Sequence, residues 1–163
     1  MNILHEEKQS FSPIGTLLVF AVLIVIGYCF VSSYRADSVS EAPDFANLVM
    51  VFVFLLDGFV FVNFRRLSVT VTDENMIVGY GLLKRKIKLE EIEDVKVDEY
   101  KWQTYLGYGI RIGRDRSRGY VARSGNGVRL KIENQPDYFI TSDNADQLAA
   151  AVKNAIASSN LKI

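Results

Sequence analysis

Two long apolar runs near the N-terminus constrain this chain of 163 residues more than any other feature. They lie at about residues 14–33 and 46–64, and the polar segment 35–45 separates them. The first holds twelve Leu, Ile, Val or Phe residues and no charge up to Val31, and the second holds thirteen such residues and one charge, Asp57. Helices that are apolar on all sides must be buried, either in a protein core or in lipid.

The side chains of both runs favour lipid. On the scale of insertion free energies the first run sums to about −4 to −7 kcal/mol, and the second to about −4 to −8 kcal/mol against a cost of about 2.5–3.5 kcal/mol for Asp57. Each run is long enough for the ~30 Å hydrocarbon layer. A cleaved signal peptide is disfavoured, because Glu6 and Glu7 lie where such peptides carry basic residues. We therefore predict a transmembrane hairpin over residues 13–66.

Basic residues predict the orientation of this hairpin. The segment 35–45 holds one arginine and three acids, whereas Arg65 and Arg66 directly follow the second run. Because positively charged flanks stay on the cytoplasmic side, we expect Arg65 and Arg66 to anchor the chain at the inner membrane surface. The prediction is a multi-pass protein of the cell membrane (inner or plasma membrane) with both termini in the cytoplasm.

Asp57 is the costly residue of the second run, and an acid at such a position is a candidate functional group. Three interpretations remain open. Its carboxyl is protonated and bonded to a backbone carbonyl near Gly58, or it pairs with another subunit or a partner helix, or it carries protons or ions. We predict an intramembrane polar contact, with helix association as the working hypothesis.

The counts of cysteine and histidine exclude several kinds of site. Cys29 is the only cysteine and His5 is the only histidine. The chain therefore lacks the residues for an internal disulfide, a cysteine metal site or a multi-histidine metal site. Paired acids beside a positioned nucleophile are also not visible. We predict a non-enzymatic protein with no cofactor and no metal.

From residue 67 onward the apolar residues alternate with polar ones, which predicts β-strands. Turn residues separate the alternating segments at intervals of about ten residues, as in an all-β barrel or sandwich. The pattern changes at Ser142-Asp143, an N-cap signal, after which Leu148, Val152 and Ile156 lie on one helical face. The expected strands are 67–72, 76–80, 83–89, 92–100, 109–113, 118–122, 127–133 and 137–141. We expect a β domain with a C-terminal helix over 67–157, between a polar N-terminal tail, 1–12, and a frayed end, 158–163.

Five short segments of this domain occur in a distinctive order. They are Gly107-Tyr108-Gly109-Ile110-Arg111, Gly119-Tyr120, Gly125-Asn126-Gly127-Val128-Arg129-Leu130, Phe139-Ile140-Thr141-Ser142-Asp143, and the apolar helix from Leu148. The set resembles the bacterial pleckstrin-homology (PH) domain family, many members of which are small membrane proteins with two spans ahead of the domain. The chain departs from that pattern at Asn134-Gln135-Pro136, where a tight Asp-Gly turn is expected.

The resemblance covers about residues 65–157, and it implies a fold without supplying a catalytic residue. The expected architecture is a two-helix transmembrane hairpin followed by a mainly-β PH-like barrel of about seven strands, capped by one C-terminal α-helix. Eukaryotic PH domains often bind phosphoinositides through a basic first hairpin. Here that hairpin holds Asp73 and Glu74, so this activity is not expected.

Basic residues gather in two places in the domain. Residues 65–163 hold seventeen bases and thirteen acids, a net charge of +4, which is too low for a nucleic-acid-binding domain. The two groups are either solvated or form a patch for anionic headgroups or an acidic partner. Trp102, Tyr105 and Tyr108 are either core residues or an aromatic rim at the membrane interface. The basic candidates are Lys84, Lys86 and Lys88 in one strand, and Arg111, Arg114, Arg116, Arg118 and Arg123 around one hairpin.

These observations predict a membrane-anchored, PH-like module that docks a protein partner or its own subunits at the cytoplasmic membrane face. Docking is expected through the transmembrane hairpin or by strand addition to an open sheet edge. The alternative is binding of anionic lipid headgroups by the basic face. Membrane lipids and a protein partner or second subunit are the expected partners, and nucleic acid is not.

Overall fold

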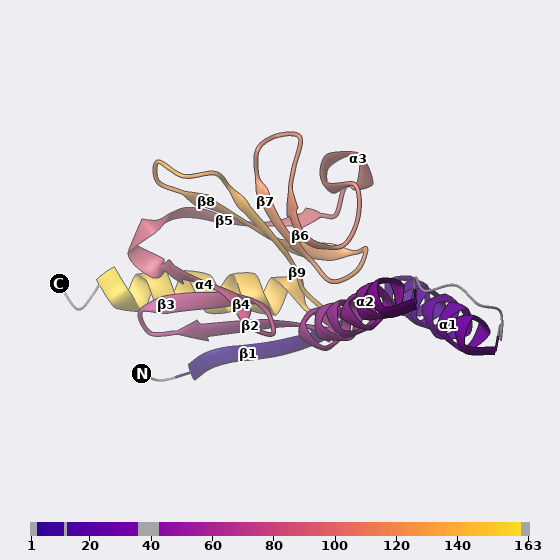
Figure 1. Cartoon of the computed structure of the whole chain (residues 1–163). Coiled ribbons are helices and arrows are strands. Elements are labelled where there is room, and N and C mark those ends of the chain that lie inside the picture. The colour runs from indigo at the N-terminus through magenta and orange to yellow at the C-terminus, as the bar shows by residue number, and fades with distance from the viewer. Residues whose placement is uncertain (1–2, 12, 36–42, 161–163) are drawn as a thin grey trace. The chain divides into compact units, whose positions relative to one another are not determined.

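A computed structural model describes residues 3–11, 13–35 and 43–160 of the chain (Figure 1). These residues divide into two compact units. One unit is helical and covers Pro13–Asn63, and the other joins the segment before Pro13 to the chain from Phe64 onward. The second unit contains every strand of the described residues and is called the β unit below.

The helical unit consists of α1 (Pro13–Arg35) and α2 (Pro43–Phe64). Each begins at a proline, whose missing N–H and fixed φ suit the first position of a helix. Large apolar side chains are exposed along both helices, including Ile24 on α1 and Phe52 on α2. The predicted outer loop, 35–45, lies mostly outside the described residues.

The structure corrects the prediction of a membrane hairpin. Among the described residues, no helix combines the length and the hydropathy that crossing a bilayer requires. The predicted transmembrane spans and the multi-pass location in the cell membrane are corrected with it. The predicted surface-anchor role of Arg65 and Arg66 stays a prediction. The physical reason is that summed side-chain transfer energies show that a helix must be covered, but they do not identify lipid as the covering.

Sheet A of the β unit has four antiparallel strands in the order β1-β2-β3-β4. Strand β1 (Ile3–Ser10) lies in the segment expected to be a solvated tail. Two of its inward side chains are polar and bond to the segment before α4. Glu7 accepts hydrogen bonds from the Ser142 hydroxyl (2.7 Å) and the Asp143 N–H (2.5 Å), and Gln9 donates to the Thr141 carbonyl (2.6 Å). The other strands are β2 (Arg66–Thr72), β3 (Asn75–Tyr80) and β4 (Leu83–Lys88).

Sheet B has five strands in the order β5-β8-β9-β7-β6. The β7 and β9 strands run parallel, and the other neighbours are antiparallel. Sheet B consists of β5 (Ile92–Glu99), β6 (Gly109–Ile112), β7 (Arg118–Val121), β8 (Asn126–Ile132) and β9 (Tyr138–Thr141). The helical segments of this unit are η1 (Leu89–Glu91), α3 (Trp102–Tyr105) and α4 (Ala145–Asn160).

The core of the β unit lies between the two sheets, and α4 packs into it from one side (Figure 1). Leu148 and Val152 of α4 are fully buried together with Val69 of sheet A and Leu130 of sheet B. Eight predicted strands agree with β2 to β9 to within one residue at each end. In most of these strands the alternating apolar residues face this core, which explains why the pattern located them, whereas Ile110 and Ile112 of β6 are exposed.

The predicted PH-like barrel of about seven strands is corrected by this topology. The described residues form nine strands in two separate sheets, and these sheets do not close into one barrel. Apolar side chains of α4 fill part of the layer between the sheets. Between β4 and β5 the chain passes from one sheet to the other through η1. There the Leu89 N–H donates a hydrogen bond to the Glu74 carbonyl.

The buried hydroxyl of Tyr80 is expected to lower the free energy of unfolding of this core. Tyr80 is fully buried, burial raises the pKa of its hydroxyl, and no described residue forms a hydrogen bond with that oxygen. Its ring stacks on Phe64 and meets the edge of Phe11. Because an unpaired buried polar group is destabilising, Tyr80→Phe should raise the free energy of unfolding by about 1 kcal/mol, measured by chemical denaturation.

Tyr138→Phe is the matched control. The Tyr138 hydroxyl accepts a hydrogen bond from Arg118 (3.1 Å), so its removal should lower the free energy of unfolding by about 1 kcal/mol. A loss of stability in Tyr80→Phe equal to that in Tyr138→Phe would show that the Tyr80 hydroxyl has a partner.

Candidate functional site

The β6–β7 hairpin gathers most of the predicted basic residues. Arg123 follows β7 and pairs with Asp143, and Arg118 donates to the Tyr138 hydroxyl and lies 5.7 Å from the centre of its ring. Within the described part of the chain, four arginines of the hairpin form no ion pair with a carboxylate. These are Arg111 on β6, Arg114 and Arg116 in the turn, and Arg118 on β7.

Strand β6 lies at the edge of sheet B and pairs with β7 alone among the described strands. Unlike most edge strands, it also exposes two branched apolar side chains, one on each side of Arg111. Ile112 is 80% exposed and Ile110 is 38% exposed. Natural edge strands usually carry charges or proline that prevent further pairing, and an exposed apolar edge therefore indicates a surface that pairs with something.

The hydrogen bonds of the hairpin show which backbone groups face the open side. The Gly113 N–H donates to the Ser117 carbonyl (2.7 Å), in register with the pairing of Arg111 with Gly119 and of Ile112 with Arg118. Hydrogen-bonded and non-bonded pairs alternate along an antiparallel ladder. The N–H and C=O groups of Arg111 therefore bond to β7, and those of Ile110 and Ile112 point away from it.

A polar network centred on Arg129 supports this hairpin from the middle of sheet B. The Arg129 guanidinium lies 2.9 Å from Asp98 on β5, 3.3 Å from Asp115 in the hairpin turn and 3.6 Å from Asp137. Asp115 also accepts hydrogen bonds from the Ser117 hydroxyl (2.6 Å) and N–H (3.1 Å). The network therefore ties the hairpin turn to the strands across the sheet.

The charges of this network lower two carboxyl pKa values. Burial alone would raise the pKa of Asp98, but the hydrogen bond from Arg129 and further contacts outweigh it and hold the pKa below its usual value. Asp115 shows the same balance, with burial opposed by hydrogen bonds from Ser117 and Arg129. Both side chains are therefore ionised and held in place at neutral pH.

Aromatic residues of the β5–β6 connection cover the outer face of sheet B. Tyr105 of α3 is buried and stacks on Phe139, with ring centres 5.3 Å apart. A Cβ atom at Gly119 would lie 2.7 Å from the Tyr105 ring, so this close packing requires glycine. Trp102 is 55% exposed. The predicted aromatic group thus divides, with Tyr105 in the core, Trp102 at the surface and Tyr108 partly buried.

The predicted lysine strand lies elsewhere in the β unit. Lys84, Lys86 and Lys88 lie on β4, the far edge of sheet A. Lys88 pairs with Glu90 (3.1 Å), and a polar hollow here includes Glu74 beside Lys86 and Lys88. This edge carries both signs of charge, and its lysines have the protective role expected on an open edge.

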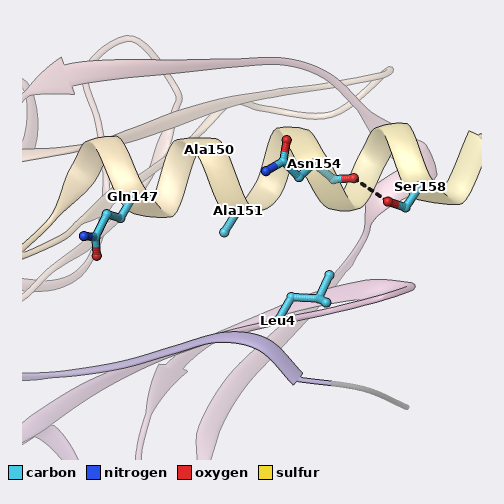
Figure 2. Close-up of a pocket in the computed structure, with 6 residues that line it drawn as sticks. All are labelled: Leu4, Gln147, Ala150, Ala151, Asn154 and Ser158. Carbon is cyan, nitrogen blue, oxygen red and sulfur yellow. Dashed lines mark hydrogen bonds between the residues drawn. The ribbon is translucent and has the colours of Figure 1, made fainter.

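A shallow groove of about 410 Å³ lies between β1 and α4 (Figure 2). Leu4 lies on one side, and Figure 2 shows the residues of one α4 face on the other. They are Gln147, Ala150, Ala151, Asn154 and Ser158. These side chains are small or neutral and polar, so the groove lacks both a deep apolar pocket and a charge that would fix one partner.

The helical unit contains Asp57 on α2. One oxygen of its carboxylate, Oδ2, is buried, and no described residue forms a hydrogen bond with it. Space is open beside the next residue, because a Cβ atom at Gly58 would meet nothing within 4 Å.

Arg65 and Arg66 lie at the start of the β unit, where the Arg65 carbonyl accepts a hydrogen bond from the Phe11 N–H (3.0 Å).

No group of three or more His, Cys, Asp or Glu side chains suited to a metal ion occurs among the described residues.

Comparisons with known protein families, with curated proteins and with solved structures find no match for this chain. Sequence reasoning located the arginines of the hairpin but missed Ile110 and Ile112, because their alternation looked like that of a core strand.

The Arg129 network predicts how stability changes with pH. The folded-state pKa values of Asp98 and Asp115 lie below the unfolded value near 4, so their stabilisation is present above about pH 4 and is lost as the pH falls through the folded values. Arg129→Ala should lower the free energy of unfolding at pH 7 by about 1–2 kcal/mol and flatten its pH dependence below about pH 4. Denaturation at several pH values measures both effects.

Lys131→Ala is the control on the same strand. Lys131 forms an exposed pair with Glu93 (2.5 Å), so its removal should change the free energy of unfolding very little. If Arg129→Ala and Lys131→Ala gave the same small loss and the same pH profile, the network would not support the hairpin.

Proposed function

We propose that the β unit is a non-enzymatic docking module that accepts an extended segment of a partner protein as an added strand along the open edge of β6. The observation that carries this proposal is that the backbone N–H and C=O groups of Ile110 and Ile112 point away from β7 while the apolar side chains of both residues are exposed. In strand addition, backbone hydrogen bonds supply affinity and alternate side chains supply specificity. Strand β6 offers both.

The other three sheet edges are less suited to an added strand. Strand β4 carries the lysines described above, and β5 carries acids and lysines in exposed pairs, such as Lys96 with Asp94 (2.7 Å). Strand β1 carries an exposed pair between Lys8 and Glu6 (2.7 Å). Charged edges discourage pairing. Strand β6 combines an open edge with two exposed isoleucines and a well-supported hairpin.

A binding role without catalysis also agrees with the chemistry of the chain. The only histidine, His5, lies on β1, and the only cysteine, Cys29, lies on α1. Neither belongs to the β6 edge.

A peptide selection tests the proposal. The full-length protein is used to select binders from a library of short random peptides, and affinities are measured for the parent, Ile112→Pro and Ile112→Val. Proline removes the outward N–H of residue 112 and is tolerated at an edge, while valine keeps it. Ile112→Pro should weaken binding about tenfold or more, and Ile112→Val should bind nearly as tightly as the parent.

The same preparation separates the proposal from its alternative. Binders whose affinity is unchanged by Ile112→Pro would place the docking surface elsewhere. A failure to select any peptide, together with salt-sensitive binding to vesicles of anionic lipid, would contradict protein docking and favour headgroup recognition by the basic face.

Docking of its own subunits is a second candidate, and the orphaned Asp57 oxygen favours it. Exposed apolar side chains on α2 surround this residue, including Phe54 and Leu56. Large exposed apolar surfaces mark interaction sites. A helix of a second copy that packs in the open space beside Gly58 would supply a hydrogen-bond donor once the Asp57 carboxyl turns toward it.

This candidate predicts a change in oligomer size. Asp57→Leu should reduce the oligomer to a smaller species, because it removes the polar contact, whereas Asp57→Asn keeps a hydrogen-bonding side chain and should retain the oligomer. Light scattering after size-exclusion chromatography in mild detergent measures the mass. An identical mass for the parent and both variants would leave Asp57 without a role in association.

A further inference from the structure

We infer that the partner segment carries an acidic residue between two apolar residues, because β6 presents Arg111 between Ile110 and Ile112 along its open edge. This inference rests on the proposed strand addition at β6. Side chains directly opposite each other on neighbouring strands lie on the same face and interact. An added strand would therefore place one residue against Arg111 and the residues on either side of it against the two isoleucines.

The guanidinium of Arg111 is held in position on the opposite face from the isoleucines. Its Nε donates to the Tyr108 carbonyl (2.8 Å). A Cβ atom at Gly107 would lie 3.2 Å from its Nη2, so glycine leaves the space that the guanidinium occupies. The Tyr100 hydroxyl donates to the Gly107 carbonyl (3.1 Å), which fixes the same turn. Arg111 forms no ion pair among the described residues, so its charge is left for a carboxylate from outside.

The neighbouring charges favour the same partner. Arg114 and Arg116 in the hairpin turn also form no ion pair within the described chain. The acid between them, Asp115, accepts a hydrogen bond from the Ser117 hydroxyl and pairs with Arg129, so it does not neutralise either arginine. The turn therefore presents uncompensated positive charge beside the open edge. Charge complementarity of this kind selects an acidic partner and speeds its association.

The occupant that fits this surface is an extended protein segment with a carboxylate side chain, Glu or Asp, flanked by branched apolar residues. A lipid headgroup would meet the arginines but would leave the outward N–H and C=O groups of Ile110 and Ile112 unpaired. The apolar–acidic–apolar order follows from the alternation of side chains along a strand.

A charge exchange tests this inference with the full-length protein. Two synthetic peptides are compared, a selected binder with Glu at its central position and the same peptide with Lys there. The parent should bind the Lys peptide roughly 3- to 10-fold more weakly, and Arg111→Glu should reverse the preference. Arg111→Gln, which keeps a donor for the Tyr108 carbonyl, should reduce the difference between the peptides.

Lys153→Glu on α4 is the matched control, because it makes the same change in net charge and lies in an exposed position outside sheet B. Its peptide preference should equal that of the parent. Selected peptides without an acid, or equal affinities of the two peptides for the parent, would overturn the inference while strand addition at β6 still stood. If no peptide at all binds the parent, the proposed function itself fails.

Discussion

The ladder between β6 and β7 determines which groups β6 can present to a partner. The bond from the Gly113 N–H to the Ser117 carbonyl sets its register. That register directs the backbone N–H and C=O groups of Arg111 toward β7, and it leaves those of Ile110 and Ile112 without a partner strand. A shift by one residue would turn the isoleucines and the arginine to the opposite faces, and the edge would present a different pattern to any partner.

The hairpin is short, so other parts of sheet B must hold it. Arg129 does so by bonding carboxylates from β5 and from the hairpin turn. Tyr105 adds a stacked contact with Phe139, and the absence of a side chain at Gly119 lets its ring approach the sheet closely. An arginine fork suits this role, because its planar donors bind several carboxylates in a fixed geometry. The polar network and the aromatic cover thus make a rigid support for an exposed edge.

The sequence predicted local structure well where apolar residues face one core. Most strands from β2 to β9 follow this rule, because residues such as Val69 and Leu130 alternate with polar neighbours, but the alternating isoleucines of β6 are exposed. Strand β1 does not follow it, since its inward Glu7 and Gln9 bond to the segment before α4. Its place in sheet A could not be recognised from hydrophobic periodicity.

The hydrophobic pattern of the sequence could not predict which distant strands pair or what surrounds the helices. The division into two sheets depends on how α4 and η1 pack, which no local alternation reports. The composition of α1 and α2 identified apolar helices but not what covers them. At the candidate site, composition located Arg111, and only the topology of the sheet showed that Ile110 and Ile112 flank it on an open edge.

Amide hydrogen exchange of the free full-length protein tests the open edge most directly, because it needs no partner. The N–H of Arg111 bonds to β7 and should exchange slowly, while the N–H groups of Ile110 and Ile112 should exchange much faster, at rates typical of unbonded amides. Equal and strong protection of all three amides would show that the edge of β6 is already occupied within the chain, and strand addition at this site would be contradicted.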